Sequence, residues 1–250
     1  MPVTALGSAA EVLVATGHDP FARGSLRRPL VRGWVAEGAT AWIGTDAQER
    51  TAYLSALGAP GAVAALLTDL LPELSAVQRV TLPRGTAARL PAWVGLESGG
   101  SDWDFRWLDV PPATQPGEDL VVELLDDAEV DVLLKQASPD ASALPGDAAV
   151  RRWWGLRDGA GQLLACAADT SAATGVGHVS SITVLPEMRD SGLGKAVTGA
   201  LTRTLFDGGC DVVTLGMYAD NEPGRRLYDA LGFRDEHRFT SGRLVQRGRW

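Results

Sequence analysis

Residues 184–196 read VLPEMRDSGLGKA and join two segments of different periodicity. The segment before the loop, His178–Leu185, is rich in β-branched residues and predicts a strand. The segment after it, Gly192–Asp207, has the apolar spacing of a helix that ends at Gly208. The sequence therefore predicts a loop that leads directly from a strand into a helix.

The residues of this loop are suited to binding an anion. Gly192 and Gly194 lack the β-carbons that would keep a ligand away from the main chain. The first N–H groups of the helix have no intrahelical partner, and the helix dipole adds positive potential there. Because Arg189 and Lys195 add formal charge on both sides of the turn, we expect a site for a pyrophosphate group.

Two common phosphate-binding motifs do not fit this loop. A P-loop, G-x-x-x-x-G-K-[ST], would need a glycine at Arg189 and a hydroxyl residue at Ala196. A dinucleotide-binding fingerprint, G-x-G-x-x-G, would need a third glycine at Val197. The sequence therefore predicts neither a P-loop hydrolase nor a nicotinamide enzyme.

Two sequence blocks suggest a family. The first, HVSSITVLPEMRDSGLGKAVTGAL at residues 178–201, contains R-x-x-G-x-G. The second, DVVTLGMYADNEPGRRLYDALGFR at residues 211–234, runs from a strand through an Asn into a helix with L-Y-x-x-L-G-F. Together they resemble the GNAT superfamily of acyl-CoA N-acyltransferases. The resemblance extends from about residue 118 to the C-terminus and implies an α/β fold with a mixed sheet.

The resemblance also implies where acetyl-CoA binds. In this superfamily two neighbouring parallel strands splay apart, and the pantetheine arm lies in the opening, here between His178–Leu185 and Asp211–Tyr218. No metal is implied. The cofactor contacts are assigned to three groups of residues: Ile182, Thr183 and Val184 along the pantetheine arm; Arg189, Asp190, Ser191, Gly192, Leu193, Gly194, Lys195 and Ala196 around the pyrophosphate; and Asn221 at the pantetheine amides.

Tyr228 is the candidate general acid, because the resemblance places this motif position beside the sulfur of the cofactor. A phenol with a pKa of about 10 stays protonated at pH 7 and can donate to a leaving thiolate. The alternative is a helix tyrosine that only packs against Leu231 and Phe233.

A general base is needed as well, because an alkyl ammonium must lose a proton before its nitrogen attacks a carbonyl. Many members of the superfamily carry Glu where this chain has His178. Val184 follows six positions later, which places both side chains on one face of a regular strand, and imidazole titrates near neutrality. A histidine at a strand edge without a catalytic role is the alternative. Ser180, Ser181 and Glu123 are then the groups that could order a water as the base.

A proline-rich segment, LDVPPATQPG, divides the chain, because it cannot sustain a helix or a central strand. We expect an N-terminal domain at residues 1–110, a linker at 111–117 and a catalytic domain at 118–250.

The N-terminal half repeats part of the downstream order. A strand, a tight turn, a helix over residues 61–71 and a strand over 77–82 predict a second, tandem GNAT-like domain. Its turn, Ala59-Pro60-Gly61, contains no basic residue, so we expect a degenerate copy that does not bind the cofactor. The same strand-helix-strand order also occurs by chance in other α/β proteins.

Composition limits the partners. The 250 residues are 45% hydrophobic and 22% charged, which is typical of a globular chain. A net charge of −8 with only two lysines, Lys135 and Lys195, argues against nucleic-acid binding. No apolar run approaches the roughly 18 residues of a membrane span. No signal peptide is recognisable either, so we expect a cytoplasmic protein. Cys166 and Cys210 are too isolated for a disulfide framework or a zinc site.

These observations predict an N-acetyltransferase that uses acetyl-CoA. A primary amine, on a small molecule or a peptide, would attack the thioester directly, without a metal or a covalent enzyme intermediate. The alternative is a noncatalytic acyl-CoA sensor or scaffold that kept the anion site and lost turnover. The residues do not indicate which amine is the acceptor, which acyl chain is preferred or how many subunits assemble.

Overall fold

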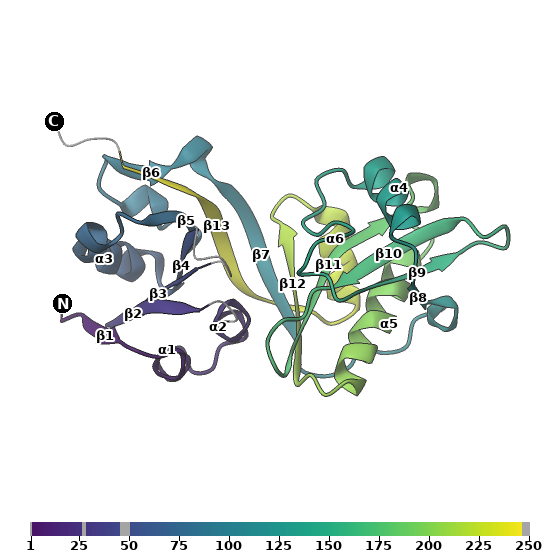
Figure 1. Ribbon diagram of the computed structural model, residues 1–250, viewed down its shortest axis with the longest axis horizontal. Helices are drawn as coiled ribbons and strands as arrows, with labels where there is room; N and C mark the ends of the chain where they lie inside the picture. The colour runs from purple at the N-terminus through teal and green to yellow at the C-terminus, as the bar shows by residue number, and fades with distance from the viewer. Residues whose placement is uncertain (1, 27–28, 46–50, 247–250) are drawn as a thin grey trace. The chain divides into compact units, whose positions relative to one another are not determined.

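The computed structural model describes residues 2–26, 29–45 and 51–246 (Figure 1). The chain forms two compact units. Unit 1 comprises Met1–Phe105, Tyr218–Asp220 and Glu236–Trp250, and unit 2 comprises Arg106–Met217 and Asn221–Asp235. The expected linker at 111–117 contains no helix or strand. The C-terminal residues after Asp235 cluster with unit 1, whereas we expected a catalytic domain that continued to residue 250.

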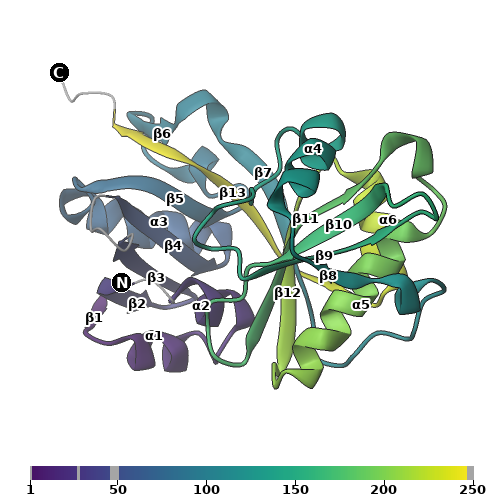
Figure 2. The same cartoon turned by 45° about the vertical axis from the view of Figure 1, so that its right-hand side comes forward.

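Unit 2 contains the loop from which the sequence analysis started. Its elements are β8 (Val122–Leu124), α4 (Asp127–Ala137), β9 (Arg152–Arg157), β10 (Leu163–Asp169), β11 (Val176–Val184), α5 (Leu193–Asp207), β12 (Val212–Tyr218, of which Tyr218 belongs to unit 1) and α6 (Glu222–Ala230). The strands lie in the order β8-β9-β10-β11-β12, and only the pair β11/β12 is parallel. The helix α5 makes this crossover and packs along the sheet (Figure 2).

Unit 1 has the same topology. Its elements are β1 (Thr4–Leu6), α1 (Ala9–Ala15), α2 (Pro20–Ser25), β2 (Leu30–Ala36), β3 (Ala39–Thr45), β4 (Ala52–Gly58), α3 (Pro60–Leu70), β5 (Val77–Pro83) and β6 (Val94–Leu96), together with parts of β7 (Ser101–Leu108) and β13 (Arg234–Gln246). Strands β1 to β5 follow one another in the sheet, and only β4/β5 is parallel. The strand-helix-strand repeat predicted from the sequence is therefore a repeat of the fold.

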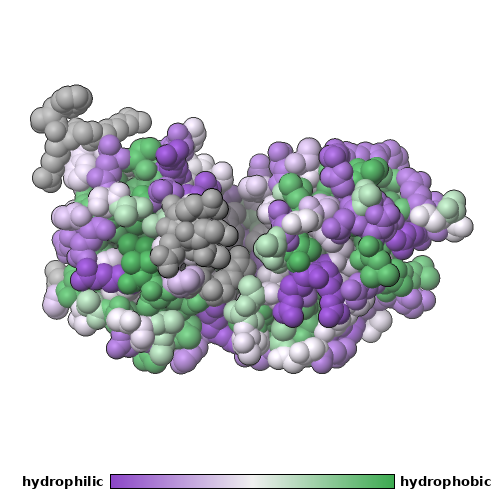
Figure 3. Space-filling model, viewed as in Figure 1, coloured by the Kyte–Doolittle hydropathy of each residue, from purple (hydrophilic) through white to green (hydrophobic). Residues whose placement is uncertain are grey.

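Each unit has its own hydrophobic core. In unit 1, Trp34 and Leu54 from the sheet pack with Leu66 from α3. In unit 2, Leu201 from α5 packs with strand residues such as Leu215. On the face shown in Figure 3, hydrophilic residues cover much of the surface, with small apolar areas between them. Among the described residues, no helix combines the length and the apolar character that crossing a membrane requires.

The strands β11 and β12 part before either of them ends. Their register begins with Val176 opposite Val212 and stops with Val179 opposite Leu215. Strand β11 nevertheless continues to Val184, and β12 continues to Tyr218. The main-chain groups of the second half of β11 that face β12 are thus outside the ladder. The splayed pair that we expected from the family resemblance is present.

A β-bulge lies in the same part of β11. Its register with β10 shifts between the pairs Ala168/Ser180 and Cys166/Thr183, and Ser181 has a positive φ of 51°. The extra residue reverses the alternation of faces along the strand.

This reversal is visible in the contacts with α5. A β-carbon added at Gly177 would lie 3.0 Å from Leu205, and Val184 lies 3.5 Å from a β-carbon added at Gly194. Both strand positions thus face α5, although seven residues separate them. The expectation that His178 and Val184 share a face is wrong, because it assumed a regular strand.

The hydroxyl of Ser181 fastens the bulge to the loop after α4. It accepts a hydrogen bond from the Ala143 N–H (2.9 Å) and donates one to the Ala143 carbonyl (2.9 Å). Both main-chain groups of a buried loop residue are therefore satisfied by one side chain.

Ser181→Ala should release this loop. Loss of both hydrogen bonds should lower the free energy of unfolding by about 1–2 kcal/mol and speed hydrogen exchange at the Ala143 amide. Exchange measured by NMR on the folded variant checks this. Ser180→Ala is the matched control, because the Ser180 hydroxyl bonds Thr170 instead (2.8 Å). Unchanged protection of Ala143 in Ser181→Ala would contradict the assignment.

Candidate active site

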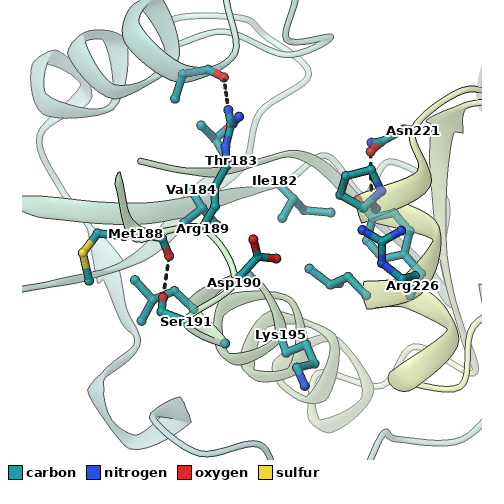
Figure 4. Close-up of a pocket in the computed structure, with 18 of the residues that line it drawn as sticks. Ile182, Thr183, Val184, Met188, Arg189, Asp190, Ser191, Lys195, Asn221 and Arg226 are labelled. Atoms are coloured by element: carbon teal, nitrogen blue, oxygen red, sulfur yellow. Dashed lines mark hydrogen bonds between the residues drawn. The ribbon is translucent and has the colours of Figure 1, made fainter. Parts of the chain in front are cut away.

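A pocket of about 830 Å³ opens beside the parted strands in unit 2 (Figure 4). This volume is in the range of sites that hold cofactors and small molecules. The pocket is lined by the end of α4, the last residues of β11, the loop into α5 and one side of α6. The lining residues are Ala137, Ser138, Ile182, Thr183, Val184, Met188, Arg189, Asp190, Ser191, Gly192, Leu193, Gly194, Lys195, Asn221, Pro223, Gly224, Arg226, Leu227, Tyr228 and Ala230.

Most of the residues that the sequence assigned to cofactor binding therefore meet in one pocket. Of the assigned set, Ala196 is not among the described lining residues, and it is fully buried in the core. His178, the candidate base, is not among them either. The roles of all these residues remain predictions at this point.

The start of α5 presents main-chain N–H groups to the pocket. The first hydrogen bond of the helix runs from the Ala196 N–H to the Gly192 carbonyl (3.0 Å). The N–H groups of Leu193, Gly194 and Lys195 therefore precede the helical ladder, and all three residues line the pocket. Gly192 caps the helix at a φ of 90° without a side-chain hydrogen bond. A helix start of this kind can bind an anion.

The two glycines of the loop serve different purposes. A β-carbon added at Gly192 would meet no atom within 4 Å, so this position faces open space. A β-carbon added at Gly194 would lie 2.6 Å from a methyl group of Leu227. Gly192 therefore leaves the helix start accessible from the pocket, whereas Gly194 lets α6 approach α5. The sequence alone had suggested the first purpose for both.

Three cationic side chains line the pocket, and the sequence analysis identified two of them. Arg189 donates a hydrogen bond to the Ala137 carbonyl at the end of α4 (3.2 Å), and Lys195 lies in the first turn of α5. The third is Arg226, which reaches the pocket from α6 (Figure 4). Local spacing did not identify it, because residues two positions apart on a helix face different directions. Asp190 adds one negative charge to the same wall.

Asn221 has a structural role that the sequence analysis missed. Its side-chain oxygen accepts a hydrogen bond from the Gly224 N–H (2.9 Å) and so caps α6. Gly224 is needed for this cap, because an added β-carbon would lie 2.6 Å from the Asn221 amide nitrogen. Asn221 thus fixes the start of the helix that carries Tyr228.

Tyr228 packs in the core and also lines the pocket, and its role as general acid remains a prediction. Its ring packs edge-on against Phe233, with 6.0 Å between centroids, and only 6% of the residue is exposed. It also lines the pocket. Burial raises the pKa of the Tyr228 phenol to about 12, and the positive charge of Arg106 opposes this rise. The phenol is therefore protonated at neutral pH and can donate a proton or a hydrogen bond.

His178 points away from the α5 side of the sheet and contacts β12. The Thr214 hydroxyl donates to the Gly177 carbonyl (2.9 Å), which uses its single proton. The hydrogen bond between His178 Nδ1 and Thr214 Oγ1 (2.8 Å) must then have Nδ1 as its donor. In the neutral ring this leaves Nε2 as the basic nitrogen.

The alternative water-ordering groups are engaged elsewhere. Ser180 bonds Thr170, Ser181 bonds Ala143, and Glu123 lies 3.4 Å from Arg152. Cys166 is fully buried, and burial together with Glu129 raises the pKa of its thiol to about 12. A thiol of this kind is not a nucleophile at neutral pH.

Unit 1 has no counterpart of the long loop. One residue, Ala59, connects β4 to α3, whereas eight residues connect β11 to α5. The first residue of α3 is Pro60, which has no N–H to offer an anion. That unit 1 does not bind the cofactor remains a prediction, and this connection supports it.

Comparisons with known proteins match the part of the chain that contains most of the pocket-lining residues. The family model described as FR47-like protein matches residues 154–241, which include the loop and α6. The mycothiol acetyltransferase of Nocardiopsis dassonvillei is 48% identical over 58 residues, or 23% of this chain and 18% of that protein. That of Pseudarthrobacter chlorophenolicus is 47% identical over the same length and shares. The match thus spans about a fifth of the curated relatives' length.

Solved structures cover the whole chain. A GCN5-related N-acetyltransferase from Sphaerobacter thermophilus has a TM-score of 0.60 at 16% identity, over 98% of this chain and 96% of that one. A tandem GNAT protein from the clavulanic acid biosynthesis pathway has a TM-score of 0.52 at 18% identity, over 100% of both chains. These likenesses show the fold. With the tandem topology and the matched sequences in agreement, residues 154–241 match the FR47-like family, and the chain has the fold of the GNAT acetyltransferases.

Proposed function

We propose that unit 2 transfers an acetyl group from acetyl-CoA to a primary amine of a small molecule or a peptide. One observation carries the proposal: the open helix start, the unpaired edge of β11 and the phenol of Tyr228 line a single pocket. The names of the curated relatives, which are acetyltransferases, support the acetyl group. Because the match covers so little of their length, it does not identify the acceptor.

The residues present fit this cofactor. The N–H groups before Ala196 and the side chains of Arg189 and Lys195 would hold the pyrophosphate. The free edge of β11 at Ile182–Val184 would pair with the amides of the pantetheine arm as an added strand does. Arg226 supplies further positive charge from α6. When bound, acetyl-CoA supplies the activated acyl group as a thioester.

The nitrogen loses two protons on the way from ammonium to amide. A base takes the first proton, and the neutral amine then forms a C–N bond to the acetyl carbon. The C–S bond breaks, CoA leaves as a thiolate, and the second nitrogen proton passes to solvent, which also protonates the thiolate. Tyr228 donates to the sulfur as negative charge develops there. Free thiols have a pKa of about 8.5, so full proton transfer from a phenol with a pKa of about 12 to a thiolate is unfavourable. A hydrogen bond from the phenol to the sulfur stabilises the developing charge without proton transfer.

Two routes are open to the amine proton. His178 can take it on Nε2, because its Nδ1 is held by Thr214. Since His178 lies outside the pocket lining, a water would have to connect it with the amine. Otherwise an ordered water alone accepts the proton. The excess of acidic residues in the chain would suit a cationic acceptor in either case.

The anion site is tested by substitution of Gly192. Gly192→Glu should abolish the rise in melting temperature that acetyl-CoA causes. The added carboxylate occupies the space at the helix start and repels the negatively charged pyrophosphate. Ligand at a hundredfold excess over Kd should add about 2.7 kcal/mol to the stability of the wild type.

Two variants are the controls for Gly192→Glu, with thermal unfolding as the measurement. Gly192→Ala carries the same backbone strain at a φ of 90° without the carboxylate, so it should keep most of the response. Gly61→Glu, at the corresponding place in unit 1, should keep all of it. An equal rise in all variants would overturn the site.

Catalysis is tested with amine pools. Wild-type protein incubated with acetyl-CoA and mixed amines should yield an acetylated product by mass spectrometry, whereas a noncatalytic sensor would yield none. Tyr228→Phe should then lower kcat by about 10²–10⁴-fold and leave the Kd for acetyl-CoA nearly unchanged. The ring and its packing on Phe233 are retained. A wild-type rate in Tyr228→Phe would mean that water or the acceptor protonates the sulfur.

The base is tested by His178→Gln. If His178 accepts the proton, the acidic limb of the kcat/KM profile should lose a component near neutrality, because a glutamine cannot titrate. At a pH below that component, the wild-type imidazole is protonated and cannot act as a base. The profile of the wild type on the same acceptor is the reference. Superimposable profiles would assign the base to an ordered water.

A further inference from the structure

Arg106 is the most deeply buried charged side chain of unit 2 that the proposed mechanism does not use. It lies on β7, and only 2% of its surface is exposed. Moving a guanidinium out of water is costly unless hydrogen bonds and an opposite charge compensate it. A position of this kind therefore has compensating partners, and these partners indicate its purpose.

Three acceptors of Arg106 lie in α6 or just after it. The guanidinium donates to the Phe233 carbonyl (2.8 Å), to the Arg225 carbonyl (3.3 Å) and to the carboxylate of Asp229. Asp229 itself is mostly solvated, with 57% of its side chain exposed. Positive charge at this place also suits the negative end of the helix dipole.

These three partners surround Tyr228 in the chain. Asp229 is the next residue, Arg225 lies one helical turn before it, and Phe233 follows the helix. The Phe233 N–H donates to the Tyr228 carbonyl (2.9 Å), and the two rings are in edge contact. A single buried side chain thus holds the main chain on both sides of the phenol-bearing residue.

The charge of Arg106 acts on the phenol as well. Burial of Tyr228 favours the neutral phenol, while the nearby guanidinium favours the phenolate. Both effects act in a water-poor environment, where charges interact more strongly than in solvent.

We propose that Arg106 is a positioning residue for Tyr228, which fixes the last turn of α6 and sets a permanent positive charge beside the proton donor. The inference rests on the proposed role of Tyr228 in acetyl transfer. It adds a residue from outside both sequence blocks of the superfamily pattern. Arg106 does not line the pocket, so it acts through Tyr228 and not on the substrate.

Two substitutions separate position from charge. Arg106→Gln keeps hydrogen-bond donors for the carbonyls and removes the charge, whereas Arg106→Lys keeps the charge with fewer donors in fixed geometry. Arg203→Gln is the matched control, because Arg203 pairs with the buried Glu118 in the same unit (2.5 Å) and does not contact α6 through that pair.

The readout is fluorine NMR of protein labelled with fluorotyrosine, with the Tyr228 signal identified by its loss in Tyr228→Phe. Arg106→Gln should move the titration of this signal to higher pH than in labelled wild type. Arg106→Lys should titrate near wild type but show faster hydrogen exchange at the Phe233 amide. Arg203→Gln should change neither.

Turnover on the identified acceptor gives the second readout. Arg106→Gln should lower kcat about tenfold or more, with the KM for acetyl-CoA nearly unchanged, because misplacement of a reacting group is felt in the transition state. A folded Arg106→Gln with wild-type titration and kcat would overturn the proposal. If that variant does not fold, wild-type kcat and exchange in Arg106→Lys would overturn it.

The two proposals fail differently. If Tyr228→Phe has a wild-type rate, the role of Tyr228 in acetyl transfer is wrong, yet the fluorine signal still reports whether Arg106 acts on the phenol. If Tyr228→Phe is slow and the Arg106 variants match the wild type, only the role of Arg106 is wrong.

Discussion

The parting of β11 from β12 is the constraint on which the site depends. Two parallel strands joined by α5 stay paired only to Val179 and Leu215, so β11 ends with main-chain groups that no neighbouring strand satisfies. The bulge at Ser181 lies at this point, and the helix start follows the end of the strand. A ligand with amides and phosphates can satisfy both sets of groups at once. The interruption in the sheet thus places the opening next to the start of α5.

The electrostatics of Tyr228 result from a balance inside unit 2. Burial among core residues keeps the phenol neutral, and Arg106 counteracts this with a charge held by the end of α6. Asn221 caps the other end of the same helix. The helix is therefore fixed at both ends, which matters because its orientation sets where the phenol meets the pocket. The chemistry assigned to one side chain depends on partners more than a hundred residues away in sequence.

The two units of the tandem repeat share one topology but differ in the residues available for chemistry. Both units place a single parallel pair after three antiparallel pairings, and both cross over with a helix. They differ in the connection: one residue in unit 1, and a loop with two glycines and two flanking cations in unit 2. The short connection leads directly into Pro60, so the start of α3 has one N–H group fewer than the start of α5, and no cation flanks it. The loop, and not the fold, therefore carries the proposed function.

The sequence by itself predicted the strand, loop and helix around residues 178–207 and the repeat of the fold, which the structure has, and it made Gly192 and Tyr228 candidates for the site. These features follow from hydrogen bonding and side-chain spacing over a few residues, which local patterns report directly. Only the tertiary structure decided that a bulge at Ser181 turns His178 and Val184 to opposite faces, that Arg226 joins the pocket and that Arg106 holds α6. A bulge changes register through its partner strand, and Arg106 meets acceptors 119 to 127 positions away. Such contacts depend on how elements pack, and no local periodicity encodes them.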